Sequence, residues 1–296
     1  MGSAAAVRGI LAAAILLASP AWSDSPEPRI VSLAPHLTEL AYAAGIDQQL
    51  VGAVEWSDYP EAARRLPRIG DAFRFDLEAI VRLGTSDALA WQDGTPQAAI
   101  DALQELGITV HPIQTRSLAG IADALEQIGA LGGQAALGAE AAHTFRARLE
   151  TFIAAAGRSP EEVPIRVLYQ VAERPLFTLG GRHVINEVLG LCGAVNVFGD
   201  IDAAALTIDF EAALAQAPLA IVAGSPDADP TSLAAWRSHG STPASRCDHL
   251  LAVDPELLVR PTPRIVEGAE RLCAWLDETV RRDPRPECRP KAAKLP

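Results

Sequence analysis

The chain has 296 residues, 49% of them hydrophobic, and a formal net charge of -12 at pH 7. Such an acidic chain is a poor partner for nucleic acid or for an anionic membrane surface, and we exclude both. Its length allows two domains of ordinary size, each with a core of its own.

Residues 1–23 have the pattern of an export signal. Arg8 supplies the positive charge, Ile10 to Leu17 form a short apolar stretch, and Ala21-Trp22-Ser23 is a small-x-small cleavage site. The apolar stretch is too short to span a bilayer. We therefore expect a periplasmic protein that begins near Asp24. Loss of Arg8, the only charge in the signal, changes its net charge from -12 to -13.

Strands and helices alternate in the first part of the mature chain. Hydrophobic patterning predicts strands at 29–33, 50–54, 88–91 and 107–110, and helices at 35–44, 77–81, 96–106 and 118–131. Strand, helix and strand within about 25 residues are typical of a parallel sheet, which binds its ligands at the carboxyl ends of its strands. Residues 24–117 are thus predicted to form an α/β lobe.

The segment 134–157 is predicted to be one long helix. Its apolar residues recur at steps of three and four: Leu137, Ala141, Phe145, Leu149, Phe152 and Ile153. Gly157 is a natural stop, and about 22 helical residues would span ~33 Å. We expect a rigid rod that joins two lobes, within a connecting segment 118–157. The alternative is an ordinary surface helix inside one large domain.

A second series of elements follows the rod. Strands are predicted at 165–169, 219–223 and 250–253, and helices at 183–191, 210–217 and 263–281. These elements form a second α/β lobe, residues 158–282. Residues 283–296, rich in Pro, Lys and Arg, are expected to be a loose tail. The predicted fold is therefore α/β, with two central, mainly parallel sheets joined by a single long helix.

The two lobes share a repeated helix-strand unit. Leu77-Glu78-Ala79-Ile80 and the strand after it correspond to Phe210-Glu211-Ala212-Ala213 and the strand after that. Each unit has a glutamate in the first turn of its helix, at Glu78 and at Glu211. A glutamate there also stabilises the helix dipole, by ~0.3 to 1 kcal/mol.

Motifs of enzymes and of metal sites are absent from the sequence. H-E-x-x-H, G-x-S-x-G, the Walker loop and G-x-G-x-x-G do not occur, and the six histidines lack ligand spacing. We expect neither catalysis nor a metal centre. Aromatic and charged residues instead occupy predicted loops beside strand ends, and they indicate a cleft for a bulky, partly polar ligand. These residues are Tyr59, Trp91, Phe177, Glu256, Arg260 and Arg264.

Several stretches resemble the substrate-binding proteins of ABC importers whose lobes are joined by one long helix, and most of all the cobalamin-binding members. The similar stretches lie within residues 28–280: Ser32-Leu33-Ala34-Pro35 with Thr38-Glu39-Leu40, Ser57-Asp58-Tyr59-Pro60, Leu77-Glu78 with Ala90-Trp91, Phe177-Thr178 with Gly180, and Arg260 with Pro263-Arg264-Ile265. The resemblance implies a monomeric class III binding protein that delivers cobalamin to the permease subunits of an importer. Cobalamin is then cargo rather than a cofactor. Haem or a ferric siderophore is the first alternative ligand, and a metal-ion binder or periplasmic enzyme is a more distant one.

The resemblance also implies roles for individual residues. Tyr59, Trp91 and Phe177 would line the corrinoid pocket, and Arg260 would meet the polar rim of the ligand. Glu256 takes the place of a pocket aspartate. Glu78 and Glu211 would dock onto arginines of the permease, one in each lobe.

Some positions depart from the cobalamin-binding pattern. Aromatic pocket residues fall on Ala72, Val171 and Ala205, although Phe73 or Phe75 could fill the first gap. His36 stands at the start of the first helix, where the cobalamin binders have no histidine. It could occupy an axial position of cobalt or of haem iron. The alternative is an ordinary polar residue at a helix start.

Four cysteines in an exported protein indicate disulfide bonds, and the sequence alone leaves three pairings open. The family resemblance implies a bond between Cys192 and Cys273. Cys247 and Cys288 then remain as candidates for a second bond.

Overall fold

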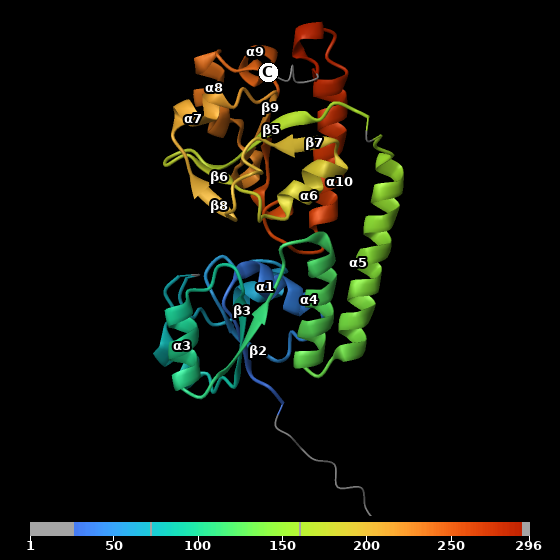
Figure 1. Cartoon of the computed structure of the whole chain (residues 1–296). Helices are drawn as coiled ribbons and strands as arrows, with labels where there is room; N and C mark the ends of the chain where they lie inside the picture. The colour runs from blue at the N-terminus through green and yellow to red at the C-terminus, as the bar shows by residue number, and fades with distance from the viewer. Residues whose placement is uncertain (1–26, 72, 160, 292–296) are drawn as a thin grey trace, which may run out of the picture.

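The molecule consists of two stacked α/β lobes with the helix α5 (Ala135–Ala156) running beside both of them (Figure 1). This computed structural model describes residues 27–71, 73–159 and 161–291. The expected fold class is confirmed, while the expected export signal lies outside the described residues. Within those ranges, every helix is too short or too polar to cross a membrane.

The first lobe contains a parallel sheet in the order β2-β1-β3-β4. Its strands are β1 (Ile30–Ser32), β2 (Leu50–Ala53), β3 (Asp87–Trp91) and β4 (Thr109–Ile113). Its helices are α1 (Pro35–Ala43), α2 (Leu77–Arg82), α3 (Gln97–Glu105) and α4 (Leu118–Leu131). All eight were predicted from the sequence, and only their ends differ by a few residues. Helix α4, which was assigned to the connecting segment, packs against α1 and so also covers this lobe.

The second lobe contains a mixed sheet in the order β10-β9-β5-β6-β8, with β7 also paired to β5. Its strands are β5 (Ile165–Ala172), β6 (Phe177–Leu179), β7 (Ala194–Asn196), β8 (Ala205–Thr207), β9 (Ala220–Gly224) and β10 (Leu250–Val253). Its helices are α6 (Ile185–Leu191), α7 (Phe210–Ala215), α8 (Ala234–His239), α9 (Pro243–Cys247) and α10 (Ile265–Trp275), which continues to Arg281 as a π-helix. The sequence analysis missed β6, β7 and β8, because three residues are too few to show an alternating pattern.

Helix α5 ends as predicted, with Gly157 in the left-handed conformation, but its buried face differs from the predicted stripe. The residues that it buries are Gly138, Ala142, Phe145 and Phe152. Leu137 and Ile153 are instead 51% and 45% exposed. The reason is the close approach of α4, which turns the small residues Gly138 and Ala142 inward and leaves no room there for larger side chains.

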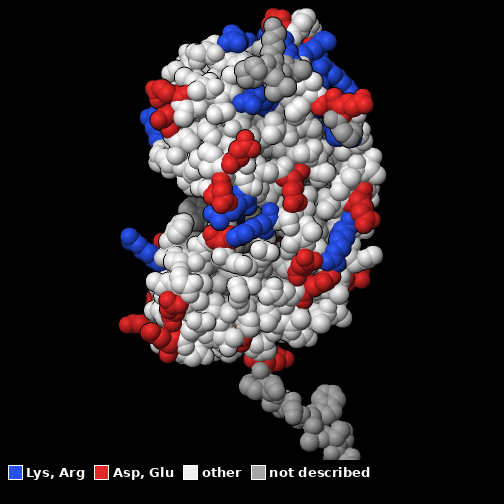
Figure 2. Space-filling model, viewed as in Figure 1, with Lys and Arg blue, Asp and Glu red and all other residues white. Residues whose placement is uncertain are grey.

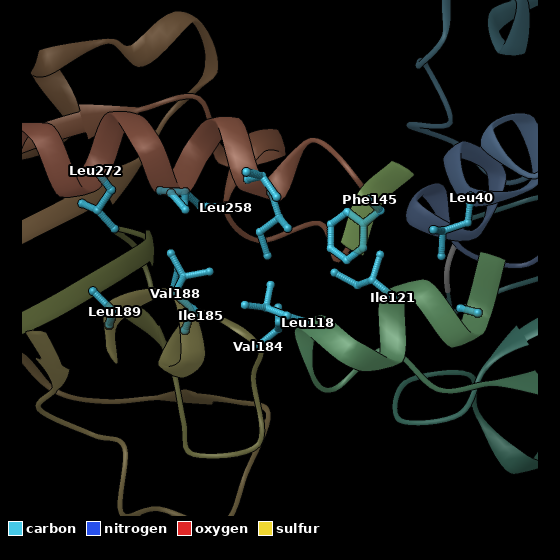
Figure 3. Packing of buried hydrophobic residues seen from close by; sticks show 14 of the residues in the cluster. Leu40, Leu118, Ile121, Phe145, Val184, Ile185, Val188, Leu189, Leu258 and Leu272 are labelled. Carbon is cyan, nitrogen blue, oxygen red and sulfur yellow. The ribbon is translucent and has the colours of Figure 1, made fainter. Parts of the chain in front are cut away.

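One hydrophobic cluster extends from the first lobe into the second (Figure 3). Leu118 of α4 lies beside Val184, the residue before α6, and Ile121 of α4 lies beside Phe145 of α5. The backbone N–H of Leu118 also donates to the Glu187 carboxylate, at 2.8 Å. The lobes are therefore joined by a shared core as well as by the rod.

Both disulfides form, the one implied by the family resemblance between Cys192 and Cys273 and the candidate bond between Cys247 and Cys288. The second bond attaches Cys288, in the C-terminal segment, to Cys247 at the end of α9. Close by, the buried Asp283 accepts hydrogen bonds from His249, at 3.0 Å, and from Arg285.

The expectation of a loose tail is therefore wrong for residues 283–288, and residues 292–296 lie outside the described part. A Pro- and Arg-rich composition does not reveal contacts with segments more than 30 residues away.

Candidate ligand-binding cleft

A cavity of about 140 Å³ lies between the lobes, where the molecular surface is hollowed at the left of Figure 2. Its first wall consists of residues at or after the carboxyl ends of β1, β3 and β4, which meet at one edge of the parallel sheet. Its second wall consists of loops beside β6, β8 and β10. The lining residues are His36, Trp91, Asp93, Thr115, Arg116, Arg182, His183, Val184, Ala204, Val259 and Pro261.

His36 and Trp91 form the apolar part of the first wall. His36 is the second residue of α1, directly after β1, and Trp91 is the last residue of β3. Their rings meet edge to face, with centroids 5.3 Å apart and planes 84° apart. Gly94 supports the indole from behind, because a Cβ atom at this position would collide with the Trp91 ring. These contacts fix both rings at the cavity.

The His36 side chain is buried and uncharged. Only 6% of the residue is exposed, and its Nε2 atom has no hydrogen-bond partner among the described residues. Burial, together with the charge of Arg260 and the proximity of His183, lowers the pKa of His36 to about 3. The positive end of the α1 dipole acts in the same direction. The imidazole is therefore neutral at physiological pH.

His183 lies on the opposite wall and differs from His36 in its bonding. Its Nδ1 accepts a hydrogen bond from the Ile185 N–H at 3.1 Å, and the ring also bonds to the backbone of Val259. Burial lowers the pKa of His183 to about 4, so this imidazole is neutral as well. Because its ring is already bonded within the second lobe, it serves to shape the wall.

Two arginines reach the cavity from opposite lobes. Arg116 forms a bidentate ion pair with Asp93, and the Arg182 guanidinium lies 3.3 Å from Asp202. Both arginine side chains stay between 40 and 50% exposed. They are positioned to donate hydrogen bonds to a polar ligand edge from both sides of the cleft.

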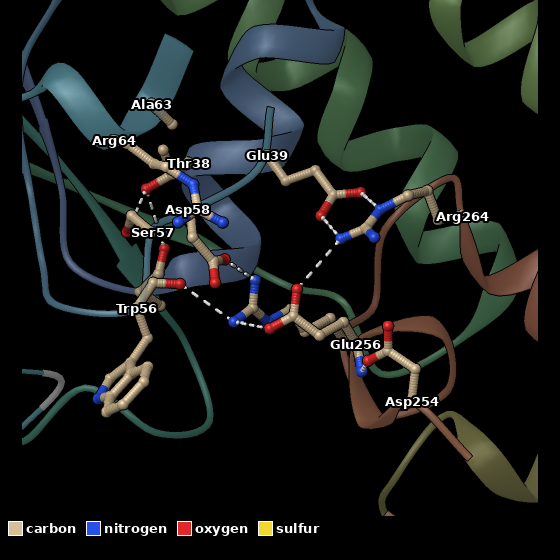
Figure 4. A network of polar contacts seen from close by, with 12 residues as sticks. Thr38, Glu39, Trp56, Ser57, Asp58, Ala63, Arg64, Asp254, Glu256 and Arg264 are labelled. Carbon is tan, nitrogen blue, oxygen red and sulfur yellow. Dashed lines mark hydrogen bonds and ion pairs between the residues drawn. The ribbon is translucent and has the colours of Figure 1, made fainter. Parts of the chain in front are cut away.

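A network of ion pairs connects the lobes beside the cavity (Figure 4). Arg260 donates to Asp58 at 2.9 Å and to the Trp56 carbonyl oxygen at 3.0 Å, and it also pairs with Glu256. Arg264 donates to both carboxylate oxygens of Glu39, at 2.8 and 2.6 Å.

Burial raises the pKa of Glu256, as do the nearby Asp58 and Asp254, while Arg260 and Arg264 act against this shift. Charges of both signs gather at this boundary in Figure 2. The network bonds the second lobe to α1 and to the loop after β2.

The structure does not bring all the predicted ligand-binding residues together at one site. Trp91 and His36 line the cavity, whereas Glu256 and Arg260 belong to the ion-pair network. Tyr59 lies under Arg264, whose guanidinium is 3.7 Å from the ring centroid, and it borders a different depression.

Phe177 is half-buried in β6, where it pairs with Thr207 of β8, and it is not among the residues that line the cavity. The sequence analysis missed Asp93, Thr115, Arg116 and Arg182 as cavity residues. Asp93 lies just after a predicted strand, and that position was the available signal. Thr115 and Arg116 lie just after β4, which ends three residues beyond the predicted strand.

The departures from the aromatic pattern persist in the structure. Val171 and Ala205 pack against the hydrophobic cluster shared by the two lobes, and Phe75 packs against a separate core of the first lobe. Phe73 is 75% exposed. Neither phenylalanine lines the cavity described here, and Ala72 lies outside the described residues. The cavity is thus bordered by a single aromatic ring system together with two imidazoles.

Glu78 and Glu211 lie in equivalent places on the two lobes. Both are exposed in the first turn of a six-residue helix, α2 or α7. Each helix begins with an aspartate cap, since Asp76 accepts from the Ala79 N–H at 2.9 Å and Asp209 from the Ala212 N–H at 2.6 Å. The sequence repeat therefore corresponds to a structural repeat.

Comparison with known proteins agrees with this architecture. The model of the periplasmic binding protein family matches residues 30–257. A vitamin B12-binding protein of Vibrio cholerae serotype O1 is 35% identical over 270 residues, which cover 90% of this chain and 96% of the relative. A vitamin B12-binding protein of Vibrio vulnificus is 32% identical over 89% of this chain and 95% of its own length.

Solved structures extend the comparison. The periplasmic vitamin B12 binding protein BtuF of Vibrio cholerae has a TM-score of 0.77 at 35% identity, covering 86% of this chain and 98% of its own. A periplasmic haem-binding protein from Pseudomonas aeruginosa has a TM-score of 0.71 at 26% identity, covering 83% and 91%. These findings confirm the resemblance predicted from the sequence and the periplasmic location. The chain belongs to the periplasmic binding protein family.

Proposed function

We propose that this protein captures a corrinoid of the cobalamin class between its two lobes and delivers it to an ABC importer. The observation that carries the proposal is the cavity between the strand ends of the first lobe and the loops of the second, in a chain that is 35% identical to a vitamin B12-binding protein over 90% of its length. No covalent step is part of this function, so we propose a binding protein and not an enzyme.

The chemistry of the cavity supports such a ligand. Trp91 presents an aromatic surface for the macrocycle, and neutral His36 and His183 avoid a buried positive charge beside it. Arg116 and Arg182 supply donors for the amide side chains at the edge of a corrinoid. The corrinoid is cargo in this mechanism, and the protein needs no cofactor of its own.

The cavity volume implies that the lobes separate to admit the ligand. A space of about 140 Å³ is smaller than the ~300 to 1,000 Å³ typical of sites for drug-sized ligands, and a corrinoid with its nucleotide loop is larger than such ligands. Separation would break the bonds of Arg260 and Arg264 to the first lobe. The rod and the shared core restrict this movement to a modest change of angle.

The test is isothermal titration of the purified protein with cyanocobalamin, using the matched variants Trp91→Ala and Trp91→Phe. We expect one-to-one binding that weakens at least 10-fold in Trp91→Ala and less in Trp91→Phe, which keeps an aromatic ring. Thermal unfolding of each variant controls for correct folding. Absence of binding heat for the native protein would contradict the proposal.

Haem is the second candidate ligand. The haem-binding protein from Pseudomonas aeruginosa is 26% identical, and Arg116 and Arg182 would pair with haem propionates more strongly than with amides. A titration with haemin alongside cyanocobalamin distinguishes the two. Saturable haemin binding in the absence of cobalamin binding would keep the transport role and change the cargo. A ferric siderophore is tested in the same way.

We also propose that the protein acts as a monomer and docks onto the permease subunits through Glu78 and Glu211. Their exposure and their equivalent positions on the two lobes support this role. Because α5 and the shared core hold the lobes together, the distance between the two carboxylates is suited to recognition by a two-subunit partner.

A further inference from the structure

We propose that His36 is an axial ligand, which coordinates the cobalt of the captured corrinoid through Nε2. The inference rests on the proposed function and narrows its ligand class to corrinoids with an exchangeable axial position, such as aquocobalamin. It concerns a residue of this chain that lines the cavity between the lobes.

The first observation is the unpartnered nitrogen. His36 Nε2 is buried and has no hydrogen-bond partner in the described part of the chain. An unsatisfied buried polar atom costs about 1 to 3 kcal/mol, and such atoms in native proteins call for an explanation. Thr115 Oγ1, on the same wall, is also buried without a partner there. Two such atoms in one cavity wall indicate a polar feature of the ligand at this place.

The second observation is the orientation of the ring. Trp91 packs edge to face against the imidazole, and the backbone of α1 holds the residue at the carboxyl end of β1. A ring fixed before the ligand arrives loses little entropy on binding. His183 provides the internal comparison, because its ring is bonded to Ile185 and Val259 and has no need of a ligand.

Coordination requires a neutral imidazole, and His36 meets this requirement. Its pKa is lowered to about 3 by burial, so a proton need not leave before binding. With the remaining proton on Nδ1, the Nε2 lone pair forms the bond to cobalt(III) and the axial water leaves. The oxidation state of cobalt does not change. Cyanide holds its axial position firmly, so cyanocobalamin would enter the same cleft without this exchange.

The closed arrangement of the lobes agrees with a ligand-dependent contact. Nε2 is buried in the closed structure, and separation of the lobes would bring the His36 wall into contact with the incoming macrocycle. Arg260, whose charge helps to keep His36 neutral, belongs to the ion-pair network whose contacts between the lobes must break during this movement.

The experiment compares aquocobalamin with cyanocobalamin. Visible spectra recorded during titration of the native protein with aquocobalamin should shift to those of the imidazole adduct, which free imidazole and aquocobalamin provide as reference. The spectrum of cyanocobalamin should stay unchanged. In His36→Ala we expect no adduct spectrum and an affinity for aquocobalamin at least 10-fold weaker. The same variant also loses a wall contact with cyanocobalamin, so its affinity for cyanocobalamin should fall as well, but by a smaller factor, because no axial bond is lost.

The matched control is His143→Ala, since His143 is exposed on α5 and removing it tests for adventitious coordination by a surface histidine. This variant should keep the full adduct spectrum. Binding of aquocobalamin without an adduct spectrum, or an adduct spectrum that persists in His36→Ala, overturns the inference and leaves the proposed function intact. Failure of the native protein to bind either cobalamin overturns the proposed function, and the inference with it.

Discussion

Glu39 is a buried carboxylate whose ion-pair partner belongs to the other lobe. Its side chain is 3% exposed and its partner Arg264 is 18% exposed. Removal of one partner from a buried ion pair leaves an uncompensated charge, which typically costs about 3 to 5 kcal/mol. We expect Arg264→Ala to lower the free energy of unfolding in urea by about 3 kcal/mol. The double variant Glu39→Gln/Arg264→Ala should recover part of this loss. Equal urea midpoints for the single variant and the native protein would contradict the pairing.

The pH dependence of stability should reflect the buried histidine His36. The unfolded chain protonates this residue near its ordinary pKa of 6.5, whereas the folded state resists protonation down to about 3. The unfolded state therefore binds more protons between these values, and stability must fall as the pH falls from about 6.5. Each pH unit well below 6.5 costs roughly 1.4 kcal/mol for such a residue. His183, with a pKa lowered to about 4, adds to the same trend.

Thermal unfolding between pH 7 and pH 4 measures this effect. The native protein should lose more stability over this range than His36→Asn, which has no proton to take up at that position. His143→Ala, altered at an exposed histidine, should follow the native curve. Parallel curves for the native protein and His36→Asn would show that His36 is not buried in the neutral form.

At the scale of elements, the contact between α4 and α5 depends on two glycines, Gly129 of α4 and Gly138 of α5. A Cβ atom at Gly138 would lie 2.6 Å from the Leu125 carbonyl oxygen and 2.9 Å from the Gly129 Cα atom. Both neighbours are backbone atoms and cannot move aside. We expect Gly138→Ala to destabilise the protein by about 1 to 3 kcal/mol, since the helices must separate.

Gly190, a helical glycine outside this contact, provides the control for the prediction. A Cβ atom at Gly190 of α6 would meet nothing within 4 Å. Gly190→Ala should therefore leave stability unchanged or raise it by up to ~1 kcal/mol through helix propensity. Thermal melting of both variants is the measurement. If Gly138→Ala and Gly190→Ala had the same melting temperature, α4 and α5 would not approach each other as closely as described.

At the scale of the whole molecule, the proposed docking depends on two carboxylates in different lobes. Charge reversal of both, Glu78→Arg/Glu211→Arg, should abolish uptake of cobalamin by cells that carry the importer. The affinity of the purified double variant for cobalamin should stay within 2-fold of the native value, since neither residue lines the cavity. Weakened affinity of the purified double variant would contradict a role restricted to docking. Reversal of Glu140, an exposed glutamate on α5, is the matched control and should leave uptake intact.

The order of the elements in the first lobe, with α5 after them, could be predicted because their signals are local. Helix α4 has the predicted bounds, and α5 begins one residue after the predicted border Gln134 and ends one residue before the predicted border Gly157. The repeat around Glu78 and Glu211 was likewise visible, since an aspartate cap and a short apolar helix need only neighbouring residues. The C-terminal segment was mispredicted, because the hydrogen bond between Asp283 and His249 joins residues far apart in the chain.

The sequence by itself determined two α/β lobes, the long helix between them, and Trp91 and His36 at strand ends that face the cleft. Hydrophobic periodicity and the geometry of parallel strands suffice for these features. The tertiary structure alone decided that Arg260 pairs with Asp58 and Arg264 with Glu39 across the lobes. It also decided that Arg116, Thr115 and Arg182 complete the cavity. These arrangements depend on how closely two separately formed lobes approach, and that distance follows from the packing of α4 and α5 and from the shared core rather than from any local pattern.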